Sequence, residues 1–271
     1  MALDPIDPAA LGFILQVERN YASLIAADGA EPSEESESSL GGKLLYAGEL
    51  DAVGRALLVA GNIAGAASLA ATADEAAQKQ AIKDGATDFL VTSLSEALRI
   101  LKNQIRKREP VAVCISTAPE VVGREMLERG VLPDLLRPAD EFSAHSPFIT
   151  QGARQISPPI LGNDSVLLTW RVASAPALWL PKLDAIARDC LHPDDHATRR
   201  WLRLAPRYLG RMAQGIRLLV CTREFAAGFI EQTGAQVERG EIAVQVEIQA
   251  RGEGIYDQHW LSPPDDSLGE S

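Results

Sequence analysis

Residues 87–120, TDFLVTSLSEALRILKNQIRKREPVAVCISTAPE, decide the fold. Thr87–Thr92 and Val111–Ser116 are short, mostly apolar runs, which is typical of strands buried on both faces of a parallel sheet. Between them, Ser93-Leu-Ser-Glu96 is a capping box that begins a helix over Leu94–Lys107. Strands that alternate with helices in this way predict an α/β domain whose parallel sheet is covered by helices on both faces.

The same alternation is predicted on both sides of this stretch. Before it, Ala56–Ala60 is predicted as a strand, and the turn Gly61-Asn-Ile-Ala-Gly65 as the start of an alanine-rich helix that runs to about Asp84. After it, Thr117–Glu120 is a second capping box, before a helix that Gly130 ends. We therefore expect one α/β domain over residues 43–150.

The regions outside this domain are of three kinds. Residues 1–42 are predicted as a helical arm (8–26) and an acidic Ser/Gly linker, with the arm docked either on its own domain or on a second subunit. Residues 151–254 are expected to form a second α/β region, and 255–271 an acidic, irregular tail. Whether the strands of the second region extend the first sheet or build another stays open. Its expected elements are strand 166–173, helices 175–191 and 195–212, strand 216–221, helix 223–233 and strand 241–249.

The composition excludes several classes of function. The chain has 26 basic and 37 acidic residues and a net charge of −11, with the excess acids near its two ends. This charge and an aromatic content of 5% argue against nucleic-acid binding. No apolar run approaches the length of a membrane span, and no secretory signal is evident. Three cysteines without CxxC spacing favour a reducing compartment, so we expect a cytoplasmic protein.

Three stretches stand in order along the predicted domain: residues 60–72 (AGNIAGAASLAAT), 125–135 (EMLERGVLPDL) and 140–147 (DEFSAHSP). Together they resemble the central NAD-binding domain of urocanase (urocanate hydratase). Residues 60–72 (AGNIAGAASLAAT) are similar to its glycine-rich turn and helix, which end in the same Leu-Ala-Ala-Thr. Residues 125–135 (EMLERGVLPDL) are similar to its Arg-Gly-Val-Arg-Pro-Asp segment, and 140–147 (DEFSAHSP) to its Asp-Gln-Thr-Ser-Ala-His-Asp-Pro loop. Their order and spacing match the family over residues 55–150, and the resemblance implies a Rossmann-like fold.

The resemblance also implies a cofactor, NAD, and a set of residues that hold it. His145 lies on a loop expected at the carboxyl edge of the sheet, so it is the candidate catalytic acid or base. A retained structural loop would explain it as well, and tight packing would explain the small residues of the turn. The implied cofactor-binding residues are Gly61, Asn62, Ile63, Ala64, Gly65, Thr117, Ala118, Glu141, Ser143, Ala144 and His145.

The chain departs from the family at points that matter for NAD. The family turn reads Gly-Gly-Met-Gly-Gly, whereas Asn62, Ile63 and Ala64 place side chains at its middle. No strand that ends in a ribose-binding acid is evident after Thr72. The flanking regions that build the family's substrate pocket, among them an Ala-Arg-Ile-Cys-Trp motif, have no counterpart. Hydration of urocanate is therefore not expected.

Two further groups of side chains are candidates for binding. Arg199, Arg203 and Arg207, with Arg211 beyond them, recur every four residues, so on one helix they form a basic stripe that suits an anionic ligand, or simply a solvated face. His192 and His196 could share a helix face, but Pro193 and the acids between them fit a helix start equally well, and no metal site is predicted.

The cysteines give little sign of catalysis. Cys114 lies within a predicted strand, so we interpret it as a buried, inert thiol. Cys221 has the same interpretation, and Cys190, near a helix end, stays ambiguous.

These patterns favour a urocanase-related Rossmann-domain protein that binds a nucleotide or a small anionic metabolite. Two alternatives stay open. A small NAD-dependent lyase or oxidoreductase would use His145 in a pocket between the two halves, with Cys190 or the arginines holding the substrate. A non-catalytic assembly protein would dimerise through the arm 8–26 and the strand 241–249. A homo-oligomer is expected, and neither nucleic acid nor membrane is expected as a partner.

Overall fold

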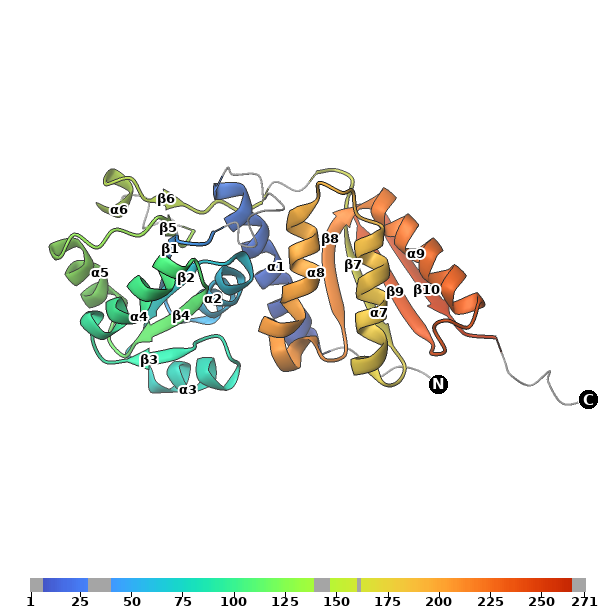
Figure 1. Cartoon of the computed structure of the whole chain (residues 1–271), viewed down its shortest axis with the longest axis horizontal. Helices are drawn as coiled ribbons and strands as arrows, with labels where there is room; N and C mark the ends of the chain where they lie inside the picture. The colour runs from blue at the N-terminus through green and yellow to red at the C-terminus, as the bar shows by residue number, and fades with distance from the viewer. Residues whose placement is uncertain (1–6, 29–39, 139–146, 160–161, 265–271) are drawn as a thin grey trace, which may run out of the picture. The chain divides into compact units, whose positions relative to one another are not determined.

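A computed structural model describes residues 7–28, 40–138, 147–159 and 162–264 (Figure 1). The chain divides into two units. The Rossmann unit comprises 13–159 with 207–210, and the antiparallel unit comprises 1–12, 160–206 and 211–271. Among the described residues, no helix is long and apolar enough to span a membrane.

The Rossmann unit contains a parallel sheet with the strand order β3-β4-β2-β1-β5-β6. The alternation of parallel strands with helices confirms the predicted Rossmann-like α/β fold. Its strands are β1 (Leu44–Glu49), β2 (Ala67–Ala71), β3 (Phe89–Val91), β4 (Val111–Ile115), β5 (Leu135–Leu136) and β6 (Arg154–Gln155). Its helices are most of α1 (Pro8–Asp28), then α2 (Ala52–Ala64), α3 (Glu75–Lys83), α4 (Leu94–Lys107), α5 (Pro119–Glu128) and α6 (Pro147–Thr150).

Helices cover both faces of this sheet. On one face, alternate strand residues such as Leu69 and Val113 join a core with Leu101 of α4 and Met126 of α5. On the other face, α2 packs against β1 and β2. The packing there is so close that a Cβ added to Gly61 would lie 2.5 Å from the Ser68 hydroxyl oxygen. Two covered faces explain why the strands are apolar along their whole length.

The predicted strand and turn at 56–65 are wrong. Ala56–Ala64 is the C-terminal part of α2, and Gly65 caps it in the left-handed conformation, with φ at +96°. The strand of this region is β2, and α3 follows it. Ten of the thirteen residues of α2 are buried. A short apolar run in a helix buried on most sides cannot be told from a buried strand by periodicity.

The two predicted capping boxes have different outcomes. At the start of α4, Ser93 accepts a hydrogen bond from the backbone N–H of Glu96 (3.3 Å), and the Glu96 carboxylate accepts one from the backbone N–H of Thr92 (3.0 Å). The first box is therefore confirmed. The second is wrong, because α5 begins after Ala118 and has no side-chain cap.

The predicted arm is confirmed as α1. The side chains of its apolar face, Ile14, Val17, Tyr21 and Leu24, are at most 4% exposed. They are buried within the chain itself, so this face is not free to meet a second subunit.

The antiparallel unit contains a separate sheet with the strand order β10-β9-β7-β8, so its strands do not extend the first sheet. Residues 255–261 of the tail, expected to be irregular, form β10 instead. β9 is flanked by β7 and β10, so its backbone is not free to pair with a second subunit. The elements are β7 (Ser165–Val172), α7 (Pro176–Asp189), most of α8 (His196–Leu209), the 3-10 helix η1 (Gly210–Ala213), β8 (Arg217–Thr222), α9 (Arg223–Glu238), β9 (Val246–Gly252) and β10 (Ile255–Leu261).

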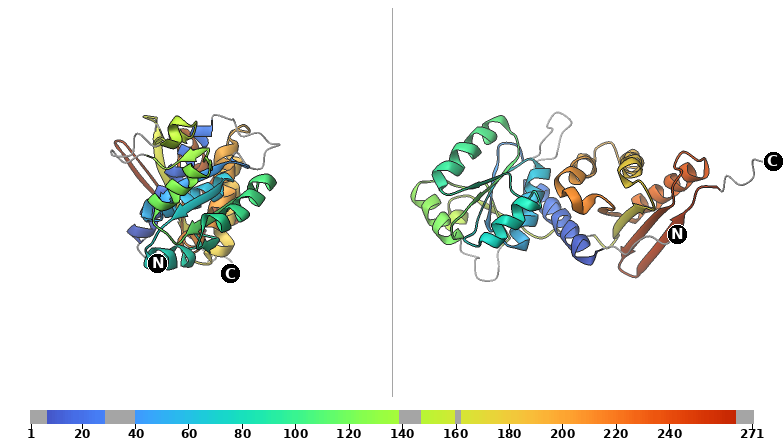
Figure 2. Two further views of the ribbon diagram at one scale, coloured as in Figure 1. Left: turned by 90° about the vertical axis from the view of Figure 1, so that its left-hand side faces the viewer. Right: turned by 90° about the horizontal axis from the view of Figure 1, so that it is seen from below.

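The core of the antiparallel unit lies between its sheet and the helices α7 and α9, which cover one face (Figure 2). Trp170 of β7 packs on Phe229 of α9 with ring centroids 5.0 Å apart. Leu168 and Ile248 are buried beside them on the same face. These large side chains fill the space between the layers at this point.

Candidate functional site

The carboxyl ends of the parallel strands meet at one edge of the Rossmann unit. Open α/β sheets bind ligands at this edge, where the chain crosses from one side of the first strand to the other. Here β1 lies between β2 and β5, and the crossing is made between β4 and β5. The residues at this edge are the turn 48–54 after β1, residues 72–74 after β2, 116–118 after β4, and Arg137 after β5.

The turn from β1 to α2 brings the backbone very close to itself. Gly48 has a φ of +67°, and a Cβ added to Gly54 would lie 2.0 Å from the carbonyl oxygen of Glu49. The Asp51 side chain caps α2 by accepting a hydrogen bond from the backbone N–H of Gly54 (2.7 Å). This is the strand-to-helix turn of the domain.

The predicted turn, Gly61, Asn62, Ile63, Ala64 and Gly65, is therefore misplaced. These residues end α2 instead of beginning a helix. A helix C-terminus presents carbonyl oxygens and the negative end of the helix dipole, so it repels a phosphate. The resemblance of this stretch to the family's glycine-rich turn does not reflect an equivalent position in the fold.

Asp51 forms an ion pair with Arg137, which follows β5 on the other side of β1. The Arg137 guanidinium donates to both carboxylate oxygens of Asp51, at 3.0 and 2.8 Å, and to the carbonyl oxygen of Glu49 at 3.1 Å. Partial burial alone would raise the pKa of Asp51, but hydrogen bonds from Arg137 and from the backbone of Gly54 and Val53 outweigh it and lower that pKa. The carboxylate is therefore kept ionised where a bound phosphate would lie.

Side chains also cap the starts of two other helices at this edge. Asp74 caps α3 by accepting from the backbone N–H of Ala76 (2.8 Å), and Ser93 caps α4. Among α2–α5, only α5 has no side-chain cap. The predicted residues Thr117 and Ala118 lie directly before this helix. Their role in binding stays a prediction.

A single strand lies between α2 and α3. It is β2, and the residue that follows it is Thr72, whose hydroxyl accepts a hydrogen bond from the backbone N–H of Asp74 (3.2 Å). Asp74 itself is engaged as the cap of α3. As expected, no strand lies between Thr72 and α3, and the place directly after β2 is held by a threonine and not by an acid.

The Tyr46 hydroxyl and the Cys114 thiol, which lie below this edge, stay protonated. The Tyr46 hydroxyl donates to the carbonyl oxygen of Pro119 (3.0 Å), and burial, with the negative charges of Glu120 and Glu49, raises its pKa well above the usual range. Burial also raises the pKa of the Cys114 thiol to about 12. Both side chains serve packing, as expected for Cys114.

The remaining predicted site residues have several outcomes. Glu141, Ser143, Ala144 and His145 lie outside the residues that the structure describes, so the catalytic role of His145 stays a prediction. His192 precedes α8 and His196 is its first residue, so the two do not share a helix face. Within the described ranges, no three His, Cys, Asp or Glu side chains are grouped to hold a metal ion.

The arginine stripe lies on one helix, as predicted. Arg199, Arg203 and Arg207 are all on α8. Arg199 donates to the carbonyl oxygen of Arg188 (3.3 Å), and the Arg207 guanidinium stacks on the Tyr208 ring at 5.4 Å. Arg211 lies beyond α8, in η1. Anion binding by these side chains stays a prediction.

The comparison with protein families agrees with this geometry. The family model for the Urocanase Rossmann-like domain matches residues 23–152. The Rossmann unit is urocanase-like. In that family the domain is associated with NAD, so the fit of NAD to the residues present becomes the deciding question.

The β1–α2 turn of this urocanase-like domain does not fit a dinucleotide. A pyrophosphate needs free backbone N–H groups and a turn without side chains. Here the Gly54 N–H is bonded to Asp51, and Glu49 adds a second carboxylate to the turn. We therefore assign no step of any reaction to NAD.

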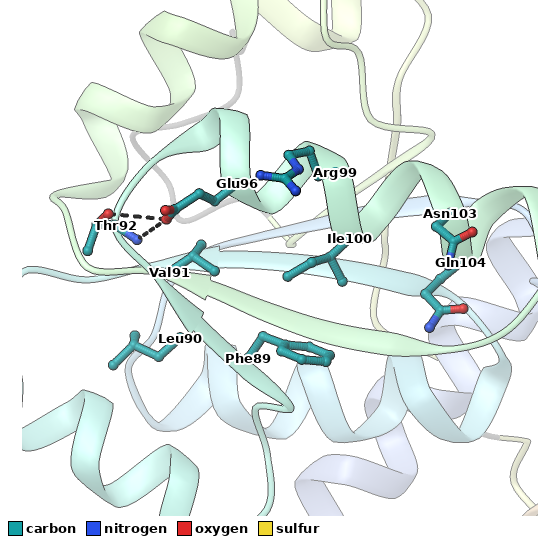
Figure 3. A pocket seen from close by; sticks show the side chains of 9 residues that line it. All are labelled: Phe89, Leu90, Val91, Thr92, Glu96, Arg99, Ile100, Asn103 and Gln104. Carbon is teal, nitrogen blue, oxygen red and sulfur yellow. Dashed lines mark hydrogen bonds between the residues drawn. The ribbon is translucent and has the colours of Figure 1, made fainter.

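Three cavities offer space for a ligand. One, of about 740 Å³, lies beside the edge strand β3. Thr92 and Glu96 stand at one end of it and Asn103 and Gln104 at the other, with Phe89 between them (Figure 3). The other two lie in the antiparallel unit.

The second cavity, of about 740 Å³, is lined by Cys190, His192 and Cys221 among others, and the third measures about 440 Å³. Burial and the nearby Asp189 raise the pKa of Cys190, so it is not a preformed thiolate. The linings of the two cavities in the antiparallel unit come from distant parts of the chain, so no local pattern signals them, whereas the first cavity is lined by residues of 89–104 alone.

Proposed function

We propose that this chain is a urocanase-related binding protein that keeps the Rossmann scaffold, does not hold NAD at the β1–α2 turn and does not hydrate urocanate. The observation that carries the proposal is the bidentate pair of Arg137 with Asp51, which caps α2. An internal carboxylate occupies the position that the cofactor's pyrophosphate takes in a Rossmann fold.

The electrostatics of this arrangement are unfavourable to a dinucleotide. A pyrophosphate at the turn would lie beside the carboxylates of Asp51 and Glu49. Displacing Asp51 would break its two hydrogen bonds to Arg137 and leave α2 without its cap. The same argument disfavours a small NAD-dependent lyase or oxidoreductase, because that activity requires the cofactor.

The ligand that we propose is a small molecule. A net charge of −11 is unfavourable to a nucleic-acid partner. The three cysteines are free thiols, which fits a cytoplasmic setting.

Because the β1–α2 turn does not fit a dinucleotide, the proposed ligand site lies away from that turn.

Two measurements on the purified full-length chain test this function. Calorimetric titration with NAD up to millimolar concentration should show no binding, and incubation with urocanate should leave its ultraviolet absorbance unchanged. Saturable binding of NAD with one site per chain, or steady loss of urocanate, would overturn the proposal. An Asp51→Ala variant titrated in parallel would show whether the turn accepts NAD once its carboxylate is removed.

Assembly is a second candidate function, favoured by the exposed edge of the parallel sheet. Phe89 and Leu90 of β3 are 46% and 39% exposed, and no charged residue interrupts the strand. The unpaired backbone groups of an edge strand can pair with another strand, so we propose that β3, three residues long, pairs with β3 of a second copy. Light scattering should give a dimer for the wild-type chain and a monomer for Phe89→Lys. A monomeric wild-type chain would overturn this candidate.

A further inference from the structure

The cavity of about 440 Å³ in the antiparallel unit lies between α9 and the sheet. Val166 of β7 and Ala250 of β9 form its floor, and Ala226, Ala227 and Ile230 of α9 form its wall. Both sides are regular secondary structure. The hollow is therefore a fixed feature of the unit and lies within the size range of small-molecule sites.

The hollow exists because the residues facing it are small. Elsewhere in the same layer, Trp170 and Phe229 fill the space between the helix and the sheet. Ala250 and the two alanines of α9 offer only methyl groups, and Gly252, which follows Ala250 on the same face of β9, adds no side chain. Protein interiors are otherwise close-packed, so unfilled apolar space of this size is open to a ligand.

The lining of this cavity contains more acidic than basic side chains. Glu231 of α9 and Asp257 of β10 both line it, and neither makes an ion pair within the part of the chain that the structure describes. The lining cation, Arg223, is engaged by Asp164 at 3.2 Å and by the carbonyl oxygen of Glu253 at 3.4 Å. His259 lies two residues after Asp257 and on the same face of β10.

We propose that this cavity binds a small organic cation. The apolar body of the ligand would lie against Val166, Ala250 and the alanines of α9, and its ammonium or amidinium head would lie between Glu231 and Asp257. The same two side chains disfavour a carboxylate or phosphate head. The inference rests on the proposed binding role and names a ligand class for it.

A matched set of probes tests the charge requirement. Benzylammonium, benzyl alcohol and benzoate share an aromatic body and differ in the head group. Saturation-transfer NMR and calorimetry on the full-length chain should show the tightest binding for benzylammonium. Benzyl alcohol should bind about two- to fivefold more weakly, since exposed ion pairs contribute modestly. Benzoate should show no saturable binding, and equal binding of the three probes would overturn the proposal.

Variants test the location. Ala250→Leu fills the hollow and should abolish saturable binding of benzylammonium, while Glu231→Gln should weaken it about two- to fivefold. Glu238→Gln, an exposed acid on the same helix but outside the cavity, is the matched control and should bind as the wild type does. If Ala250→Leu fails to fold, Ala227→Leu on the helix wall takes its place. Unchanged binding in a folded leucine variant would overturn the proposal.

The NAD titration separates this inference from the proposed function. If NAD binds and benzylammonium also binds in the cavity, the proposal that the β1–α2 turn excludes NAD is overturned and the cation site is supported. If neither molecule binds, the cation site is overturned and the proposal that the β1–α2 turn excludes NAD is still supported.

Discussion

Arg137 and Asp51 are 86 residues apart in the chain and share two hydrogen bonds of 2.8 and 3.0 Å. The pair joins the segment after β5 to the start of α2, across the carboxyl end of β1. It gives the start of α2 an internal anion with its own counter-ion.

Removal of the Asp51 carboxylate should destabilise the chain. Asp51→Ala removes the cap of α2 and leaves Arg137 without its carboxylate partner, so we expect a loss of about 1–2 kcal/mol in the free energy of unfolding. Urea denaturation measures it. Asp74→Ala, which removes the cap of α3, is the control and should cost about 1 kcal/mol or less. An Asp51→Ala chain as stable as the wild type would show that the pair does not stabilise the turn.

The pair should also make stability depend on pH. The pKa of Asp51 is lower in the folded chain than in the unfolded one, so its contribution is present above the unfolded value, about 4, and is lost as the pH falls through the folded value. The difference in free energy of unfolding between wild type and Asp51→Asn should therefore shrink as the pH is lowered from 7 to 3. A difference that is constant over this range would contradict the assignment.

The close approach at Gly54 should tolerate no side chain. In Gly54→Ala the new Cβ would lie 2.0 Å from the Glu49 carbonyl oxygen, which is backbone and cannot swing away. We expect a loss of about 3 kcal/mol, at the upper end for overpacking. Gly85, with a φ of +70° and open space around it, is the control. Gly85→Ala should cost only about 1–2 kcal/mol for its left-handed backbone, and equal losses for the two variants would refute the steric argument.

Thiol labelling should distinguish the cysteines. Cys114 is fully buried with a pKa of about 12, so iodoacetamide at pH 8 should leave it unmodified in the native chain and modify it after unfolding in urea. Half-buried Cys190 should react slowly before unfolding. Peptide mass spectrometry reads each site. Modification of Cys114 at the rate of Cys190 in the native chain would contradict the burial of β4.

Local patterns in the sequence predict much of the fold. The capping box at Ser93 predicts α4, and the apolar run at 111–116 predicts β4, because both signals lie within a few neighbouring residues. The same reasoning misplaces α2. Asp51 and Gly65 are a typical N-cap and C-terminal glycine for this helix, but its buried apolar interior imitates a strand.

The candidate sites depend on pairs that no local pattern reveals. Arg137 lies in a proline-rich stretch that looks like loop, and nothing near it points to Asp51. The cavity under α9 needs Ala250, Ala226 and Val166 to meet, and β10, with Asp257, looks like part of an irregular tail. Contacts between distant segments are set by tertiary packing, which hydrophobic periodicity does not encode.

The NAD content of the purified chain is the most direct test of the claim that the β1–α2 turn excludes NAD. Protein purified without added ligand would be denatured, and the released small molecules would be quantified by mass spectrometry. The Asp51–Arg137 pair predicts that no NAD is released. Release of one NAD per chain would contradict this account, because the cofactor would then be held despite the carboxylate at the start of α2.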